Sequence, residues 1–150
     1  MTEPSPRLFA DAAQVRRLGD GLIACTLDRA DWTHEAHLGA TLSLVVERPE
    51  LHLERELPRL IRRFNESVGG VNSDTEGYHH TITLTYLAAI RDHAAETAGQ
   101  ELCARTNALL LSERGRRDWP LRLYSPERLF SVDARRGWVE PDLRPIGWSC

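Results

Sequence analysis

The residues of this chain best suited to chemistry are histidines, and two of them stand in the segment W-T-H-E-A-H-L at positions 32–38. His34 and His37 are three residues apart, a spacing that places two side chains about 5–6 Å apart on one face of a helix. A second pair, His79 and His80, follows a glycine-containing segment. Neutral imidazole binds zinc, iron, nickel and copper. The histidines therefore predict a metal site.

The helices that must position these residues follow from hydrophobic periodicity and from capping residues. Apolar residues recur at spacings of three and four, and Gly and Pro separate the periodic segments. Thr33 or Asp31 is expected to cap the second helix, and Ser73 with Glu76 fits a capping box for the fourth. The sequence predicts an all-α, up-down helical bundle of four to five main helices plus a short C-terminal helix. The expected segments are residues 10–28, 33–47, 50–68, 73–97, 100–113 and 126–136.

Short connections imply antiparallel neighbours, so the second and fourth helices are expected to point the same way. His34 and His37 then lie in the first turn of the second helix, and His79 lies in the second turn of the fourth, so all three are expected at a similar depth. A helix N-terminus also disfavours the protonated imidazolium. We therefore expect these three side chains to bind one transition metal ion (Zn, Fe, Ni or Cu), with open positions for water or substrate.

The other histidines are assigned by their place on each helix. His80 lies about 100° round its helix from His79, on the flank of the apolar stripe. His93 is about 20 Å further along the same helix at 1.5 Å per residue, and His52 lies off its apolar stripe. Neither His93 nor His52 is expected in the site.

Two readings of the histidines and of Glu35 stay open at this point. Each inward imidazole is either a metal ligand or a hydrogen-bonded core residue in a polar network, because buried polar groups need partners. Glu35 either complements the helix dipole or acts as a general base. The spelling H-E-x-H is not the H-E-x-x-H of metalloproteases, so it assigns Glu35 no role by itself.

The loops 69–78 and 115–125 are expected to reach the histidine end of the bundle and to form the walls of any catalytic site. Polar loop residues with apolar neighbours suit a small-molecule pocket. Tyr124 is the candidate catalytic, substrate-facing group, and aromatic packing is its alternative role.

Five further charged residues are less informative. Asp74 and Glu76 are expected to cap a helix rather than to bind metal. Asp133, Arg135 and Asp142 are expected to form a structural ion pair, with a carboxylate ligand as the alternative.

The chain also resembles a family of small bacterial helical proteins of unassigned function. The segments that carry the likeness are W-T-H-E-A-H-L, G-Y-H-H-T-I-T and Y-S-P-E-R-L-F-S-V-D-A-R-R-G-W-V-E-P-D-L. The family pattern is W-T-H-x-x-H-L, G-Y-H-E-T-I-T and A-R-x-x-W-V-x-P-D-L. This resemblance implies a site on His34, His37 and His79. It departs at His80, where the family has an acidic residue, so a fourth nitrogen ligand replaces a carboxylate there.

Composition limits the class of protein. The 150 residues fit one domain, and the net charge of −3 with no lysine gives no reason to expect nucleic acid or a membrane as partner. Cys25, Cys103 and Cys150 form no C-x-x-C pair, which favours a reducing cytoplasm. No signal peptide and no apolar run of about 20 residues is evident.

Two classes of function follow. The first is a metal-dependent enzyme that acts on a small molecule at the end of the bundle. The second is a non-catalytic small-molecule or metal-binding module with a polar histidine cluster. An HD-type phosphohydrolase is less supported because the chain has no His-Asp dipeptide, and the absence of G-x-S-x-G, P-loop and G-x-G-x-x-G motifs argues against three other classes. The sequence does not predict the metal, the substrate or the oligomeric state.

Overall fold

The computed structural model describes residues 4–146, and in this range the chain folds into seven α-helices and three short 3-10 helices without any β-strand. The five main helices are α1 (Ala12–Ala24), α2 (His34–Glu47), α3 (Leu53–Ser67), α4 (His80–Glu96) and α5 (Leu102–Leu111). Two short helices, α6 (Pro126–Leu129) and α7 (Val132–Arg136), follow, and the 3-10 helices are Arg29–Asp31, Glu113–Gly115 and Pro120–Arg122. The predicted all-α class is therefore confirmed.

Side-chain caps fix where most helices begin. The Thr33 hydroxyl accepts a hydrogen bond from the Ala36 amide at 3.0 Å, which starts α2 at His34 as predicted. Helix α6 begins at Pro126, as the predicted segment does, and it is capped by Ser125, while Ser131 caps α7. The C-terminal helix was expected to be continuous, but it divides into α6 and α7.

The start of α4 differs from the prediction. Ser73 does not cap a helix, because its hydroxyl accepts instead from the amides of Thr75 and Glu76 and closes a turn within the loop. Gly77 then has a φ of +81°, a left-handed conformation that ends any helix arriving from this turn. The helix therefore begins at His80, four residues later than Glu76, and His79 lies before its first turn.

The core lies on both sides of α2. On one side Leu38 and Leu42 pack with Tyr86 and Ile90 of α4. The other side packs against α1 and α3, with members that include Leu18, Leu22, Ala40, Leu44, Leu57 and Phe64. Apolar burial on two opposite sides makes α2 the central helix of the fold.

The contact between α1 and α2 explains a glycine that weakens the helix pattern in the sequence. A Cβ atom at Gly19 would lie 3.0 Å from the Ser43 hydroxyl oxygen, so only glycine allows this approach without a shift. Gly19 therefore contributes close helix packing at some cost in helix propensity.

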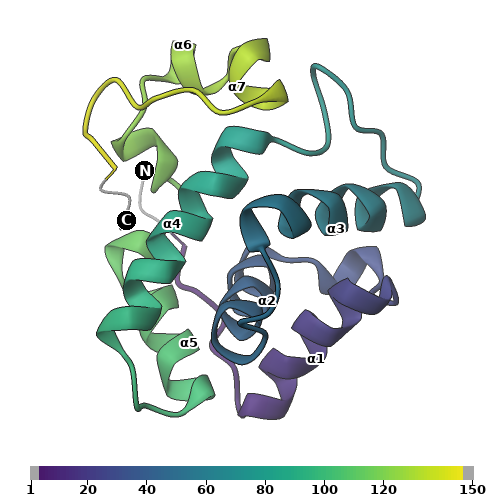
Figure 1. The fold of residues 1–150 in the computed structure, drawn as a ribbon, viewed down its shortest axis with the longest axis vertical. Helices are drawn as coiled ribbons and strands as arrows, with labels where there is room; N and C mark the ends of the chain where they lie inside the picture. The colour runs from purple at the N-terminus through teal and green to yellow at the C-terminus, as the bar shows by residue number, and fades with distance from the viewer. Residues whose placement is uncertain (1–3, 147–150) are drawn as a thin grey trace.

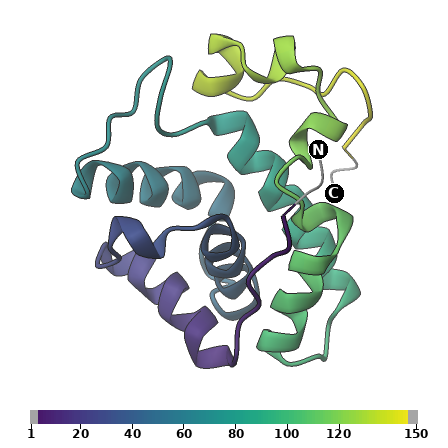
Figure 2. The ribbon, with the colours of Figure 1, turned by 180° about the vertical axis from the view of Figure 1, so that it is seen from behind.

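The main helices cross one another. In Figure 1, α2 is seen nearly end-on, whereas α3 and α4 lie across the view. The same relation is visible from behind in Figure 2, where α6 and α7 again lie beside the N-terminal end of α4. In these views α2 crosses α4 instead of running alongside it. No helix within residues 4–146 is long and apolar enough to cross a membrane.

Cys25 and Cys103 are free thiols, and Cys150 lies outside the described residues.

Candidate functional site

The first turn of α2 sends its two histidines into different cavities. His34 lines a cavity of about 220 Å³ together with Glu35 and Gly115. His37 lines another, of about 300 Å³, together with Trp32 and His79. His34 and His37 therefore line different cavities even though they are three residues apart on one helix.

His34 is held by the loop that follows α5. Its Nε2 lies 2.8 Å from the carbonyl oxygen of Gly115. A carbonyl oxygen can only accept, so Nε2 carries the hydrogen and donates it. The Tyr86 ring meets the His34 ring edge-on with 5.7 Å between centroids. One nitrogen of His34 is therefore unavailable to a metal in this structure.

His79 uses both of its ring nitrogens inside the protein. Its Nδ1 accepts from the Ile82 amide at 3.1 Å and thereby caps α4, and its Nε2 donates to the Leu129 carbonyl oxygen at 2.8 Å. Burial is the main cause that lowers the pKa of His79, and the Arg135 guanidinium lowers it further. A neutral ring with both nitrogens engaged is a structural link between α4 and α6.

His80 begins α4 and faces a different partner. Its Nδ1 shares a hydrogen bond of 2.9 Å with the Tyr78 hydroxyl. Burial lowers the pKa of His80, with a further contribution from the charge of Arg62. His80 is not among the residues that line the His37 cavity.

His37 is the histidine that the protein leaves available. The ring is half-buried and lines the cavity. Its centroid lies 5.1 Å from that of Trp32, and no side chain within residues 4–146 forms a hydrogen bond with it. Burial, and to a smaller extent the nearby His34, lowers the pKa of His37 to about 4. The ring is therefore neutral at pH 7, and both nitrogens are free to bind a ligand.

The His37 cavity has walls that are mostly apolar. Ile61 and Phe64 of α3 form one side, and Ile82 of α4 forms another. Gly77 and Tyr78 come from the loop before α4. The expected contribution of loop 69–78 is thus observed for this cavity, whereas residues 115–125 line other cavities.

The predicted three-histidine metal site is not assembled in the structure. Within the described part of the chain, no three His, Cys, Asp or Glu side chains are grouped so that they could hold a metal ion. The physical reason is that backbone carbonyl groups take one nitrogen of His34 and one of His79, and the cap of α4 takes the other nitrogen of His79.

Glu35 lies in the first turn of α2 and is buried, with only 7% of its side chain exposed. Its carboxylate is 3.4 Å from the Arg117 guanidinium and 3.4 Å from the Arg7 amide. The carboxylate therefore complements the positive end of the helix and a guanidinium. It lines the His34 cavity and not the His37 cavity, so a general-base role beside His37 is not supported.

Tyr124 does not have the predicted substrate-facing position. The side chain is fully buried, and its hydroxyl donates to the Val139 carbonyl oxygen at 2.7 Å. Burial raises its pKa to about 12. It meets the Trp138 ring edge-on, so its observed role is the alternative one, aromatic packing.

The remaining charged candidates take structural roles other than those predicted. Asp74 pairs with Arg136 at 2.6 Å instead of capping a helix, and Glu76 is exposed in the loop. Asp142 accepts from the Ser125 amide and hydroxyl. Arg135 donates to the Gly77 carbonyl oxygen at 3.0 Å. The ion pair expected among Asp133, Arg135 and Asp142 is not formed.

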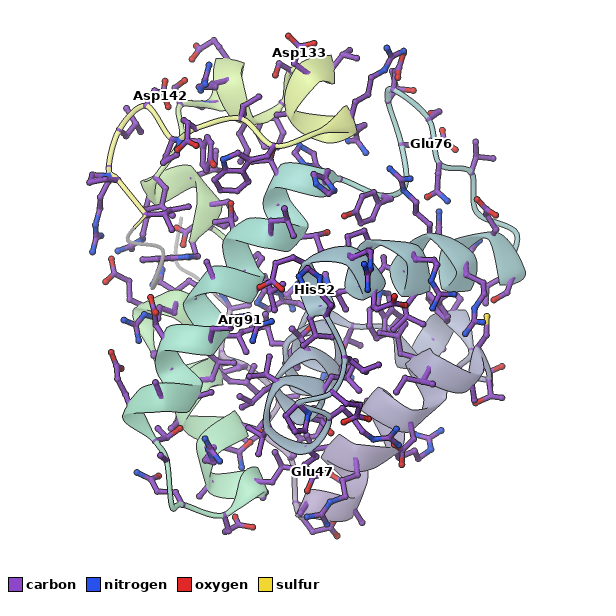
Figure 3. The ribbon with its side chains drawn as sticks, viewed as in Figure 1. Glu47, His52, Glu76, Arg91, Asp133 and Asp142 are labelled. Atoms are coloured by element: carbon purple, nitrogen blue, oxygen red, sulfur yellow. The ribbon has the colours of Figure 1, made fainter. Side chains whose placement is uncertain are left out.

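The two histidines expected outside the site do lie apart from the His37 cavity. His52 is exposed next to the first turn of α3, and Figure 3 labels it. His93 is buried, and its Nε2 bonds the Arg105 carbonyl oxygen at 2.8 Å.

The aromatic wall of the His37 cavity was not predicted from the sequence. Trp32 and Phe64 have ring centroids 5.2 Å apart, and Tyr78 lies across the cavity on the loop. In the sequence, Trp32 stands directly before Thr33, the cap of α2. That position does not indicate which helix the Trp32 ring contacts.

Comparison of the chain with protein-family models, with curated proteins and with solved structures found no match in any of the three. The site must therefore be interpreted from its own geometry.

Replacing His79 tests its structural role. We expect His79→Ala to lower the free energy of unfolding by about 2 kcal/mol, because it removes a helix cap and leaves the buried Leu129 carbonyl unpaired. His79→Asn should recover about 1 kcal/mol of this loss, since asparagine is a good N-cap. Urea unfolding measures both. Exposed His52→Ala is the control and should be nearly neutral; equal stabilities for all three variants would contradict the assigned cap.

The pH dependence of stability tests the state of His37. Its folded-state pKa is about 4 and its ordinary value is 6.5, so between these values the unfolded chain binds the proton more readily. Stability from neutral His37 is therefore complete above pH 6.5 and is lost as the pH falls toward 4, by about 3 kcal/mol. Urea unfolding across this range should show a steeper decline for the native chain than for His37→Gln. Parallel curves would show that the ring is not buried in its neutral form.

Proposed function

We propose that the chain binds a small uncharged organic molecule in the His37 cavity, through a hydroxyl or N–H group that hydrogen-bonds to the His37 ring. The observation that carries this proposal is a neutral, enclosed imidazole with no partner in the described protein, which lines a cavity of about 300 Å³. Buried polar groups are normally paired, so a ligand that supplies the missing hydrogen bond gains free energy there.

The composition of the walls favours an uncharged ligand. No Asp, Glu, Arg or Lys lines this cavity, so a charged molecule would lose its hydration without gaining an ion pair. The rings of Trp32 and Phe64 offer an apolar face for an aromatic or aliphatic body. The volume is at the lower end of the range for small-molecule sites. These features support a binding module, and the proposal includes no chemical step.

A direct test uses phenol as the probe, because it combines a ring with one hydrogen-bond donor. We expect saturable changes in the ¹H–¹⁵N spectrum at Trp32 and at the amides of Gly77 and Tyr78. His37→Leu should weaken binding about tenfold, the value of one hydrogen bond of about 1.4 kcal/mol. His52→Leu is the matched control and should bind phenol as the native chain does. Shifts spread over the surface, or undiminished binding by His37→Leu, would contradict the proposal.

The metal-dependent enzyme predicted from the sequence requires a rearrangement of the same residues. His79 would have to release the Leu129 carbonyl or the cap of α4 before it could join His37 at one ion. His34 would have to turn from its own cavity toward that of His37, and His80, which bonds Tyr78 through Nδ1, would have to reach the same ion. The donor set as folded does not fit a transition metal.

Metal analysis of protein purified without an affinity tag therefore has a clear expected outcome. The content of zinc, iron, nickel and copper should be far below one ion per chain, because no three possible ligands are grouped within residues 4–146. A stoichiometric ion that is lost in His37→Gln but retained in His52→Gln would instead support the three-histidine site.

A further inference from the structure

A second groove lies on the other side of Tyr78 from the His37 cavity. Its volume is about 320 Å³, and it is bordered by α3, by the loop before α4 and by α7. Figure 3 labels Glu76 on this loop and Asp133 on α7. Three guanidinium groups line the groove, those of Arg62, Arg135 and Arg136.

Only one of these three charges is neutralised by a carboxylate. Arg136 makes two hydrogen bonds of 2.6 Å to the oxygens of Asp74. Arg135 donates to the uncharged carbonyl oxygens of Gly77 and Tyr78, at 3.0 and 3.4 Å. Neither Arg135 nor Arg62 has an ion-pair partner within residues 4–146.

Arg62 is held in place by an aromatic face. Its guanidinium carbon lies 4.7 Å from the centroid of the Tyr78 ring. The one other carboxylate of the groove, Glu66, accepts a hydrogen bond of 3.0 Å from the Asn72 amide. Three guanidinium groups against two carboxylates leave the groove with a positive charge.

The two arginines also lie close enough to the neighbouring imidazoles to act on them. Burial is the largest cause of the lowered pKa values of His79 and His80, and the charges of Arg135 and Arg62 respectively lower them further.

We propose that this groove binds a phosphate group between the guanidinium groups of Arg62 and Arg135. A planar guanidinium can offer two parallel N–H donors to phosphate oxygens, and two such groups match the charge of a phosphate dianion. A carboxylate carries one negative charge, so it would balance the charge of only one of the two guanidinium groups. The site takes either free phosphate or the phosphate of a small monoester, and it stands on residues other than those of the His37 cavity.

Titration of the full chain with inorganic phosphate at constant ionic strength tests the site. At slightly alkaline pH, where phosphate is mostly dianionic, we expect saturable ¹H–¹⁵N shifts at Gly77, Tyr78 and the last turn of α7. Arg62→Gln should weaken binding about tenfold, the effect of one charge-assisted hydrogen bond. Arg62→Lys should recover part of the affinity, because it restores the charge without the planar fork.

The matched control is Arg63→Gln, one residue along α3. Arg63 is exposed and donates to the Ile23 carbonyl oxygen, away from the groove, so its loss should leave phosphate binding unchanged. Arg135→Gln tests the second contact, and its amide spectrum without phosphate shows whether the loop keeps its conformation. Unsaturable shifts, or equal weakening by Arg63→Gln and Arg62→Gln, would overturn the site in favour of nonspecific attraction.

Phenyl phosphate distinguishes the two sources of the phosphate group. Tyr78 borders both cavities, and Asn65 of the His37 cavity donates to Asn72 of the groove at 2.8 Å. Affinity equal to that of inorganic phosphate would assign the groove to the free anion. Tighter binding of phenyl phosphate, with added shifts at Trp32, would assign it to a monoester. Either result supports the phosphate site, and the phenol experiment can fail without affecting it.

Discussion

The link made by His79 is the interaction on which the arrangement at this end of the molecule depends. One ring nitrogen caps α4, and the other donates to the carbonyl oxygen of Leu129, fifty residues away in the sequence. Together these bonds fix where α4 begins and where α6 is placed. They also fix Tyr78, the preceding residue, as the wall between two cavities. A side chain that looks like a metal ligand in the sequence is therefore the joint between α4 and the C-terminal segment.

This joint determines the character of the remaining histidines. With both nitrogens of His79 engaged and one nitrogen of His34 donating to Gly115, His37 is the histidine of residues 4–146 that lines a cavity with both ring nitrogens free. Burial keeps that ring neutral, and its neighbours are aromatic or aliphatic. The segment W-T-H-E-A-H-L thus serves two purposes. Thr33 caps α2 and His34 anchors the helix to a distant loop, while Trp32 and His37 form the surface that we propose contacts a ligand.

Local patterns predicted much of the fold. Interactions within a few residues determine that α2 starts after a Thr cap and that α6 starts at Pro126 after Ser125. The apolar residues on one face of α3 are buried for the same kind of local reason, their helical spacing. The orientation of the histidines was predicted less well, because a helical wheel gives the direction of a ring but not the atom that it meets. The partners of His34 and His79 are backbone carbonyl groups 81 and 50 residues away, which carry no signal in residue type. Tyr124 was misplaced for the same reason, since the Val139 carbonyl oxygen that it meets has no signature in the sequence. The resemblance to a bacterial helical family, the cytoplasmic location and the absence of a nucleic-acid partner stay predictions.

The hydrogen positions and charges of the histidine rings are tested most directly by a two-bond ¹H–¹⁵N spectrum at neutral pH, since this spectrum reports which ring nitrogen carries hydrogen. The account predicts neutral rings for His37 and His79, with the hydrogen of His79 on Nε2. It also predicts hydrogen on Nε2 of His34. On addition of phenol, the His37 nitrogens should shift while those of His79 stay unchanged. A His79 ring with its hydrogen on Nδ1 would contradict the helix cap. A positively charged His37 at neutral pH would contradict the neutral ring in the cavity.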